Sequence, residues 1–337
     1  MRTFKTLIPA ILLTGLSCPS GYGQQHVPAT IITIEVETFV EYFNDTFDTT
    51  KWATIPTVTS VVFPKNFTIA TAVADVVSVN GQPVKGTMLR DQRSVSLNAN
   101  PTPGQAIGDT GRLAVVTDYF EVQKPDGTPI GTIISTGVGP GTPPPGAPLS
   151  AALGNFAIIS GTGAFLGVRG QVAQNPFPQT SSLRQASVTE DPANRRLNGG
   201  GRTRFLMHVI PLERPDIMRN GNGPSIYHSA DALLVSSNKP AAAGETLTLL
   251  ATGLGPTKPG VDPGSPFAGS PSAAVNSPVA ITVNGQSAEV LEAIGYPGTV
   301  DAYQVTFRVP TNAAQGIAAI QIFSAWIAGV PAKIAIQ

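Results

Sequence analysis

Apolar and polar side chains alternate along much of this chain with a period of two. In the segment RLAVVTDYFEVQ, residues 112–123, Val116, Asp118 and Phe120 share one face while Val115 and Tyr119 share the other. The segment DAYQVTFRVP, residues 301–310, alternates in the same way. Because an amphipathic helix would repeat about every 3.6 residues, the period of two predicts half-buried strands and an all-β fold class.

Short turn sequences separate the predicted strands. Asn80-Gly81 and Asn284-Gly285 each supply two residues that adopt positive φ readily, as a two-residue hairpin turn requires. The tripeptide PDG at 125–127 turns the 112–123 strand into a following strand, TPIGTIIST. VNGQ occurs in both halves of the chain, but its flanks differ, so we interpret it as shared turn chemistry and not as a repeat.

The segment ISGTGAFLGVRGQV, residues 159–172, has two interpretations, a phosphate-binding loop or a connection between strands. A phosphate loop needs a helix directly after its glycines, because the helix N-terminus supplies the anion site. Here the following residues include Gly170, Pro176 and Pro178, which exclude a helix. We therefore expect a tight strand connection with close packing at a barrel corner.

The C-terminal part of the chain, residues 230–337, predicts a separate domain. About seven short strands punctuated by Gly and Pro are expected in roughly 105 residues, which fits an immunoglobulin-like β-sandwich. The preceding residues 213–229 contain RPDIMRNGNGPS, which is rich in turn residues and has little apolar periodicity. We expect a linker over 213–229, with the first domain spanning 24–212.

Two stretches resemble known families. FAIISGTGAFLGVRGQV is similar to the GGTGxFxxARG signature of the dirigent and allene oxide cyclase-like superfamily, and the resemblance extends over about Thr30 to Leu212. This resemblance implies an eight-stranded antiparallel barrel with an apolar lumen. GETLTLLATGLGP, ITVNGQSAEV and YQVTFRVP resemble the immunoglobulin-like C-terminal domain of many bacterial secreted proteins, which is related to IPT/TIG modules. That second resemblance implies no known catalysis.

Composition and charge narrow the range of partners. The chain has 337 residues, enough for two domains, with 21 Lys and Arg, 21 Asp and Glu, and only 12% charged residues. This low and balanced charge argues against nucleic acid or an anionic membrane as partner. The 35 glycines and 31 prolines favour short strands and turns over long helices.

The first 23 residues resemble an export signal in their pattern. Arg2 and Lys5 precede an apolar stretch from Leu7 to Leu16 that is too short to span a bilayer, and small residues follow near position 23. No later apolar run has the length of a transmembrane span. We expect a secreted, periplasmic or extracellular protein. A lipoprotein anchored through Cys18 is the alternative that we favour less.

Few residues offer catalytic chemistry, and we identify no catalytic set. The three histidines are scattered, so no metal site is expected, and neither a G-x-S-x-G nucleophile motif nor a cofactor-binding motif is present. Asp118 lies on the apolar face of its strand, where an unpaired carboxylate is costly, and Arg169 is the expected partner inside the barrel. Asp118, Arg169 and His208 are the ligand-binding candidates. For each of them, a structural role is the interpretation that we favour over a ligand role.

Two classes of function remain. In the first, the protein is a secreted, non-catalytic binding, adhesive or scaffold protein. Its barrel then holds a small apolar ligand or acts as a scaffold, and its sandwich meets a cell-surface or extracellular protein partner. In the second, the barrel is a dirigent- or cyclase-like enzyme, isomerase-like in type, that steers cyclisation or coupling of a small apolar molecule. We favour the first, because fold resemblance alone does not give function.

Overall fold

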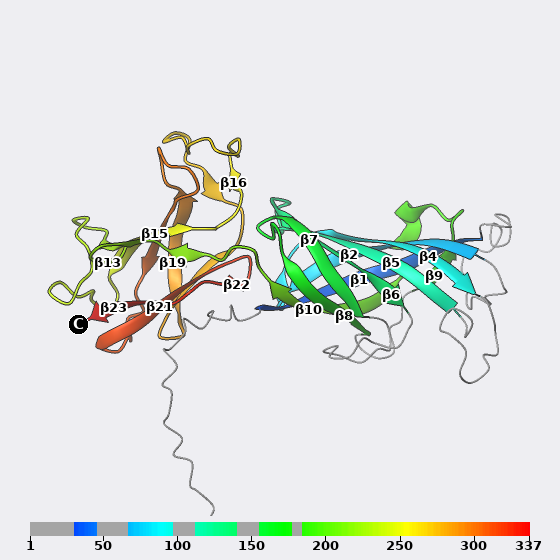
Figure 1. Ribbon diagram of the computed structural model, residues 1–337, viewed down its shortest axis with the longest axis horizontal. Helices are drawn as coiled ribbons and strands as arrows, with labels where there is room; N and C mark the ends of the chain where they lie inside the picture. Colours follow the sequence, from blue (N-terminus) through cyan, green and yellow to red (C-terminus); the bar gives the residue numbers. More distant parts are fainter. Residues whose placement is uncertain (1–29, 46–66, 97–111, 140–154, 177–183) are drawn as a thin grey trace, which may run out of the picture.

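The computed structural model describes residues 30–45, 67–96, 112–139, 155–176 and 184–337. These residues form an all-β molecule, with a closed eight-stranded antiparallel barrel and a second, curled sheet beside it (Figure 1). The all-β fold class and the eight-stranded barrel are therefore confirmed. The expected export signal over 1–23, with Cys18, lies outside the described residues.

The barrel closes because its first strand pairs with β2 on one side and with β10 on the other. Pairing follows the order β1-β2-β4-β5-β6-β7-β8-β10 and is antiparallel around the ring. The eight strands are β1 (Thr30–Asp45), β2 (Phe67–Val79), β4 (Thr87–Ser96), β5 (Arg112–Gln123), β6 (Pro129–Gly139), β7 (Asn155–Gly163), β8 (Arg169–Pro176) and β10 (Gly201–Ile210).

Two short strands and one helical turn extend the ring. β3 (Gln82–Pro83) pairs with β2 after a hairpin turn, and β9 (Arg184–Ser187) runs parallel to the second half of β1. The short 3₁₀ helix η2 (Pro192–Arg195) follows β9, with Asp191 as its N-cap. In the β2–β3 turn, Asn80 and Gly81 have φ values of 50° and 76°, so the hairpin predicted from this pair is confirmed.

The glycine-rich segment connects β7 to β8 as a tight turn, as predicted. Gly163 and Gly167 have φ values of 61° and 68°, in the left-handed region that favours glycine. At Gly170, where φ is 144°, an added Cβ would collide with the backbone carbonyl of His208 on β10. Glycine is therefore required here by turn geometry and by the close approach of the neighbouring strand.

The second sheet contains strands from both sides of the expected boundary at residue 230. Its main order is β11-β15-β20-β19-β18-β21-β22, with β14 on β15, β23 on β21, and β17 joining β16 to β19. The turn at Asn284-Gly285 joins β18 to β19, as predicted. The strands are β11 (Asp216–Ile217), β14 (Ile226–His228), β15 (Thr246–Thr252), β16 (Thr257–Lys258), β17 (Ala274–Val275), β18 (Val279–Val283), β19 (Gln286–Gly295), β20 (Tyr303–Arg308), β21 (Gly316–Ser324), β22 (Ile327–Ala328) and β23 (Ala332–Ile336).

The segment 213–229 differs from the linker that its sequence predicts. β11 and β14 lie within it, and both pair with the same edge of β15. Ile217 and Ile226 are buried in the core of the second sheet. A small ribbon of β12 (Arg219–Asn220) and β13 (Gly223–Pro224) lies between them. The turn residues were interpreted correctly, but strands of two or three residues are too short to show a period.

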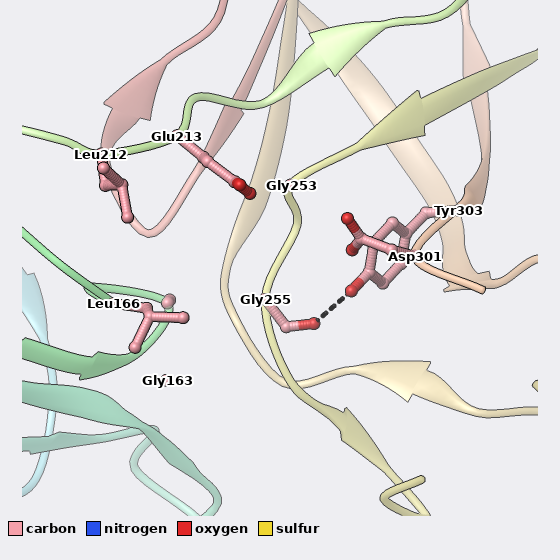
Figure 2. Close-up of a pocket in the computed structure, with 9 residues that line it drawn as sticks. Gly163, Leu166, Leu212, Glu213, Gly253, Gly255, Asp301 and Tyr303 are labelled. Carbon is pink, nitrogen blue, oxygen red and sulfur yellow. Dashed lines mark hydrogen bonds between the residues drawn. The ribbon is translucent and has the colours of Figure 1, made fainter. Parts of the chain in front are cut away.

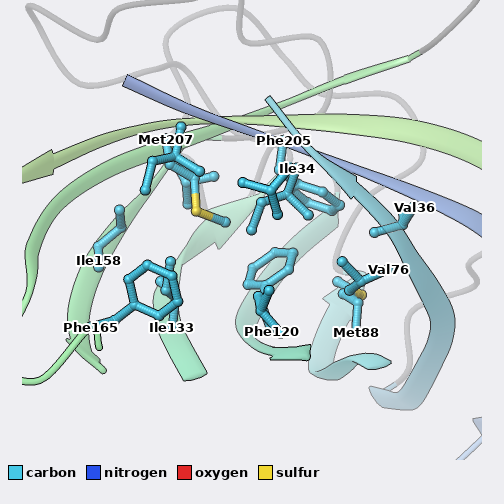
Figure 3. Close-up of a cluster of buried hydrophobic side chains, with 14 of the residues drawn as sticks. Ile34, Val36, Val76, Met88, Phe120, Ile133, Ile158, Phe165, Phe205 and Met207 are labelled. Carbon is cyan, nitrogen blue, oxygen red and sulfur yellow. The ribbon is translucent and has the colours of Figure 1, made fainter. Parts of the chain in front are cut away.

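The barrel interior is filled with apolar side chains along much of its length. Figure 3 shows side chains from strands around the ring, among them Phe120, Phe205 and Met207, pointing toward one another. Phe120 and Phe205 are edge to face, with ring centroids 4.8 Å apart. Both rings have no accessible surface, so no water-sized space lies beside them.

The second sheet completes one end of this core. Ala325 and Ile327, at the turn between β21 and β22, are buried in the same apolar cluster as the barrel residues, and Trp326 packs against it. The indole Nε1 of Trp326 donates a hydrogen bond of 2.9 Å to Oε1 of Gln82. The barrel and the second sheet therefore share packed side chains. Within the described residues, no helix has the length and apolar character needed to cross a membrane.

Candidate functional site

A buried charged cluster lies inside the barrel around Asp118 on β5. The guanidinium of Arg90, on the neighbouring strand β4, donates from Nε to Asp118 Oδ1 at 2.7 Å and from Nη2 to Oδ2 at 2.9 Å. Arg90 Nη2 also donates to Oε1 of Gln174, on β8, at 2.8 Å. Strands β4 and β5 are adjacent, and their register places Arg90 directly opposite Asp118.

The surroundings of the cluster favour a charged pair. The guanidinium of Arg90 lies over the rings of Phe39 and Phe156, at 5.5 and 5.8 Å from their centroids. Burial acts to lower the pKa of Arg90, but the adjacent Asp118 carboxylate outweighs it and raises the pKa above its ordinary value. Arg90 is therefore a permanent cation, neutralised by a fully buried anion.

The geometry of this cluster suits structural support better than acid–base catalysis. Both carboxylate oxygens of Asp118 accept hydrogen bonds from Arg90, so neither is poised to take a proton from a substrate. The hydroxyl of Ser135, also buried, has no hydrogen-bond partner among the described residues. Ser135 lies opposite Asp118 in the register of β5 and β6.

Arg169 and His208 are not part of the cluster. The expected pairing of Asp118 with Arg169 is wrong, since Arg90 occupies that place and Arg169 is exposed, with Nη1 donating to the carbonyl of Val168 at 3.0 Å. His208 is not a core residue either. On β10 every second position from Gly201 to Val209 is buried, so the residues between them, including His208, lie on the outer face.

Sequence reasoning missed Arg90 because the pattern of β4 does not show which face is buried. The inward residues of TMLRDQRSVS are Met88, Arg90, Gln92 and Ser94, whereas Leu89 is 41% exposed. A row that is mostly polar is ordinarily interpreted as the solvent face. The useful signal was Asp118, because an inward carboxylate requires a cationic partner.

A small cleft lies between the barrel and the second sheet (Figure 2). It has room for about 140 Å³ and is lined by Leu166 after β7, by Leu212 and Glu213 after β10, and by Asp301 and Tyr303 of the second sheet. The hydroxyl of Tyr303 donates to the carbonyl of Gly255 at 2.7 Å, and burial raises the pKa of this phenol. The cleft is acidic and small, and its one buried hydroxyl is already bonded.

A larger groove, of about 330 Å³, lies on the outer face of the second sheet. It is lined by side chains from β14, β15 and β20 and from the turns beside them: Tyr227, His228, Ser229, Ala232, Thr248, Leu250, Tyr296 and Gln304. Within the described residues, no group of three or more His, Cys, Asp or Glu side chains could hold a metal ion.

Comparison with known proteins gives little further guidance. No protein-family model matches the chain. No curated protein matches it either. A solved structure described as a polysaccharide lyase is similar at 10% identity and a TM-score of 0.17, covering 91% of this chain and 40% of that chain. The chain therefore spans less than half the length of that lyase, and a similarity this low assigns neither a shared fold nor an activity.

Proposed function

We propose that this chain is an exported, non-catalytic binding protein. Its barrel is the scaffold, and its second sheet presents the interaction surface to a cell-surface or extracellular partner. The barrel is of the dirigent and allene oxide cyclase-like type and the second sheet is an immunoglobulin-like, IPT/TIG-related module. The GTGAFLGVRG corner and the strand pattern of the C-terminal residues support these assignments. Export rests on the short apolar stretch and small residues at the N-terminus.

One observation carries the scaffold role, namely the absence of accessible surface on side chains at the centre of the barrel. Phe39, Phe120, Ile133 and Phe205 have no accessible area, and neither does the carboxylate-bearing Asp118. A ligand-binding barrel needs an interior space of several hundred Å³. A barrel closed by its own side chains supplies rigidity instead.

A second candidate function is a dirigent- or cyclase-like enzyme. The buried charged cluster favours it, because Arg90, Asp118 and Gln174 converge there. The nearby hydroxyl of Ser135 also lacks a partner among the described residues. A reaction steered there would use the guanidinium to stabilise developing negative charge. We favour the scaffold, because Asp118 already satisfies that guanidinium through two hydrogen bonds.

Titration with the apolar fluorescent probe N-phenyl-1-naphthylamine tests the proposal. The native protein should show no saturable binding of the probe. Phe120→Ala removes one ring from the filled interior and should leave an apolar space that takes benzene, so benzene binding by this variant and not by the native protein provides the positive control. Saturable binding by the native protein, abolished by substitution of Arg90, would support the enzyme and contradict the scaffold.

A further inference from the structure

The groove on the outer face of the second sheet has a floor built from three adjacent strands. Register places Tyr227 of β14 opposite Thr248 of β15, and Leu250 of β15 opposite Gln304 of β20. The residues between them, such as Leu249, point into the core. The groove is therefore fixed by strand pairing and alternation, which makes it a preformed surface.

The walls of the groove come from the ends of these strands. Tyr296 follows β19 directly and is 37% exposed, and Ala232 lies in the turn after β14 with a φ of 57°. Ser229 lies beside Thr248, and their hydroxyls are 2.8 Å apart and hydrogen-bonded. Two tyrosine rings thus border a floor that carries hydroxyl and amide groups.

The lining of the groove contains no permanently charged side chain. None of the described residues that line it is Asp, Glu, Lys or Arg. His228 is held by its own partners, with Nδ1 at 2.5 Å from Oε1 of Glu245 and Nε2 at 3.2 Å from the carbonyl of Lys239. Its ring nitrogens are therefore not available to a ligand. No Lys or Arg side chain lines the groove to bind an acidic ligand, and His228 is already in contact with the Glu245 carboxylate.

We propose that this groove binds a segment of a neutral polysaccharide. The faces of Tyr227 and Tyr296 suit the apolar C–H faces of a pyranose ring, as amphipathic aromatic rings do in general. The amide of Gln304 and the hydroxyls of Ser229 and Thr248 exchange hydrogen bonds with sugar hydroxyls. The volume is near the lower end of the range for ligand sites, roughly 300–1,000 Å³, which suits a short stretch of sugar chain.

A proline-rich peptide is the other ligand that aromatic grooves commonly take. The prolines of such a peptide offer backbone carbonyls as acceptors but no N–H donor, so only the donor groups of Gln304, Ser229 and Thr248 would be used. Sugar hydroxyls both donate and accept, and so use the acceptor oxygens of these side chains as well. The hydrogen-bonding floor therefore favours a polyhydroxylated ligand. This assignment rests on the proposed function, since it names the ligand class for the interaction surface of the second sheet.

Affinity electrophoresis of the full-length protein tests the assignment. The gels contain hydroxyethylcellulose, xylan, galactomannan or, as an acidic control, polygalacturonate. At least one neutral polysaccharide should retard the protein, and polygalacturonate should not. Retardation should be unchanged between about 50 and 500 mM sodium chloride, because no Asp, Glu, Lys or Arg side chain lines the groove.

Single substitutions locate the binding. Tyr227→Ala and Tyr296→Ala should each weaken retardation by about tenfold, whereas Tyr227→Phe should retain most of it because the ring remains. Tyr119→Ala, at a 43% exposed tyrosine on the outer barrel wall, is the matched control and should bind like wild type. Thermal melts confirm that each variant is folded.

Three results would overturn the assignment. These are no retardation by any of the neutral polysaccharides, equal retardation of wild type and both Tyr→Ala variants, or binding of a polyproline peptide that the Tyr→Ala variants lose. None of them bears on whether the barrel is filled, which the fluorescent probe measures separately. The polysaccharide assignment and the scaffold proposal can therefore fail independently.

Discussion

At the scale of single residues, the Arg90–Asp118 pair places two opposite charges in the interior of the barrel. Side-chain exposure is 6% for Arg90 and 0% for Asp118, so both charges have lost nearly all contact with water. Such a pair contributes little net stability, because desolvation offsets the attraction. Removing one partner is different, since it strands the other charge in a medium of low polarity.

Asp118→Ala should therefore lower the free energy of unfolding by roughly 3–5 kcal/mol. Arg169→Ala should lower it by less than about 1 kcal/mol, because Arg169 is exposed and has no part in the pair. Urea denaturation of the two variants measures both values. Equal destabilisation by the two substitutions would contradict the assignment of Arg90 as the partner.

The double variant Arg90→Met/Asp118→Leu distinguishes the stability lost by leaving one buried charge unpaired from the stability lost through poorer packing. It removes both charges and keeps apolar bulk, so we expect it to recover most of the stability that Asp118→Ala loses. A double variant as unstable as the sum of its singles would show that the two side chains act independently.

Asp75 on β2 is expected to make the stability of the folded protein depend on pH in the acid range. It accepts hydrogen bonds from Arg195 and Arg196, which flank the end of η2, and from Thr38 Oγ1 at 2.5 Å. Burial acts to raise the pKa of Asp75, but these partners outweigh it and hold the pKa below its ordinary value of 3.8. A carboxyl whose pKa is lower in the folded state than in the unfolded state stabilises the fold at pH values above its unfolded-state pKa. This stabilisation is lost as the pH falls through the folded-state pKa.

Asp75→Asn should accordingly cost about 1–3 kcal/mol at neutral pH. The variant should also lose less additional stability than wild type between about pH 5 and pH 2. Urea denaturation across this range measures the difference. Asp91→Asn, at an exposed carboxylate on the adjacent strand β4, is the matched control and should cost less than about 0.5 kcal/mol at neutral pH. A wild-type profile in Asp75→Asn would contradict the role of Asp75.

At the scale of elements, the β7–β8 corner depends on the absence of a side chain at Gly170. A methyl group there would collide with the His208 carbonyl of β10, and neither backbone can move without disturbing the barrel ladder. We expect Gly170→Ala to cost at least about 3 kcal/mol. Thermal denaturation measures this loss.

Gly127→Ala is the matched control for this substitution. Gly127 has a φ of 87°, but an added Cβ would meet nothing within 4 Å. We expect a cost of about 1–2 kcal/mol from backbone strain alone. If Gly170→Ala proved no more costly than Gly127→Ala, close packing would not be the reason for glycine at the corner.

Elements with a local chemical signal could be predicted from the sequence. The Asn-Gly turns and the glycine-rich corner were predicted because positive φ selects their residues. The alternation of 112–123 correctly placed Asp118 on the buried face. The inward row of β4 could not be predicted, because the partners of Arg90, Asp118 on β5 and Gln174 on β8, are far away in sequence. Gln92 and Ser94 are polar but buried, and they hydrogen-bond to each other.

At the scale of the whole molecule, the β21–β22 turn joins the two parts. Ala325 and Trp326 have φ values of 47° and 65°, which are unfavourable for residues with side chains. Their contacts with the barrel core compensate this strain. The sequence could not predict this junction, because it consists of packing between residues far apart in the chain. The edge pairing of β11 and β14, over 213–229, could not be predicted because strands of two or three residues are too short to show a period.

Trp326→Ala should uncouple the two parts. Wild type should unfold in one calorimetric transition, whereas the variant should lose about 2 kcal/mol and show two. Val330→Ala, at a 46% exposed position shortly after the same turn, should behave as wild type. A single unchanged transition in Trp326→Ala would show that the shared core does not couple the parts.

A crystal structure of the protein under xenon pressure shows whether the barrel is a scaffold filled by its own side chains. Xenon binds in closed apolar cavities that hold no water. Phe39, Phe120 and Phe205 have no accessible surface, so we predict no ordered xenon among these rings in wild type and a bound xenon in Phe120→Ala. Ordered xenon among the same rings in wild type would show an interior cavity and contradict the scaffold.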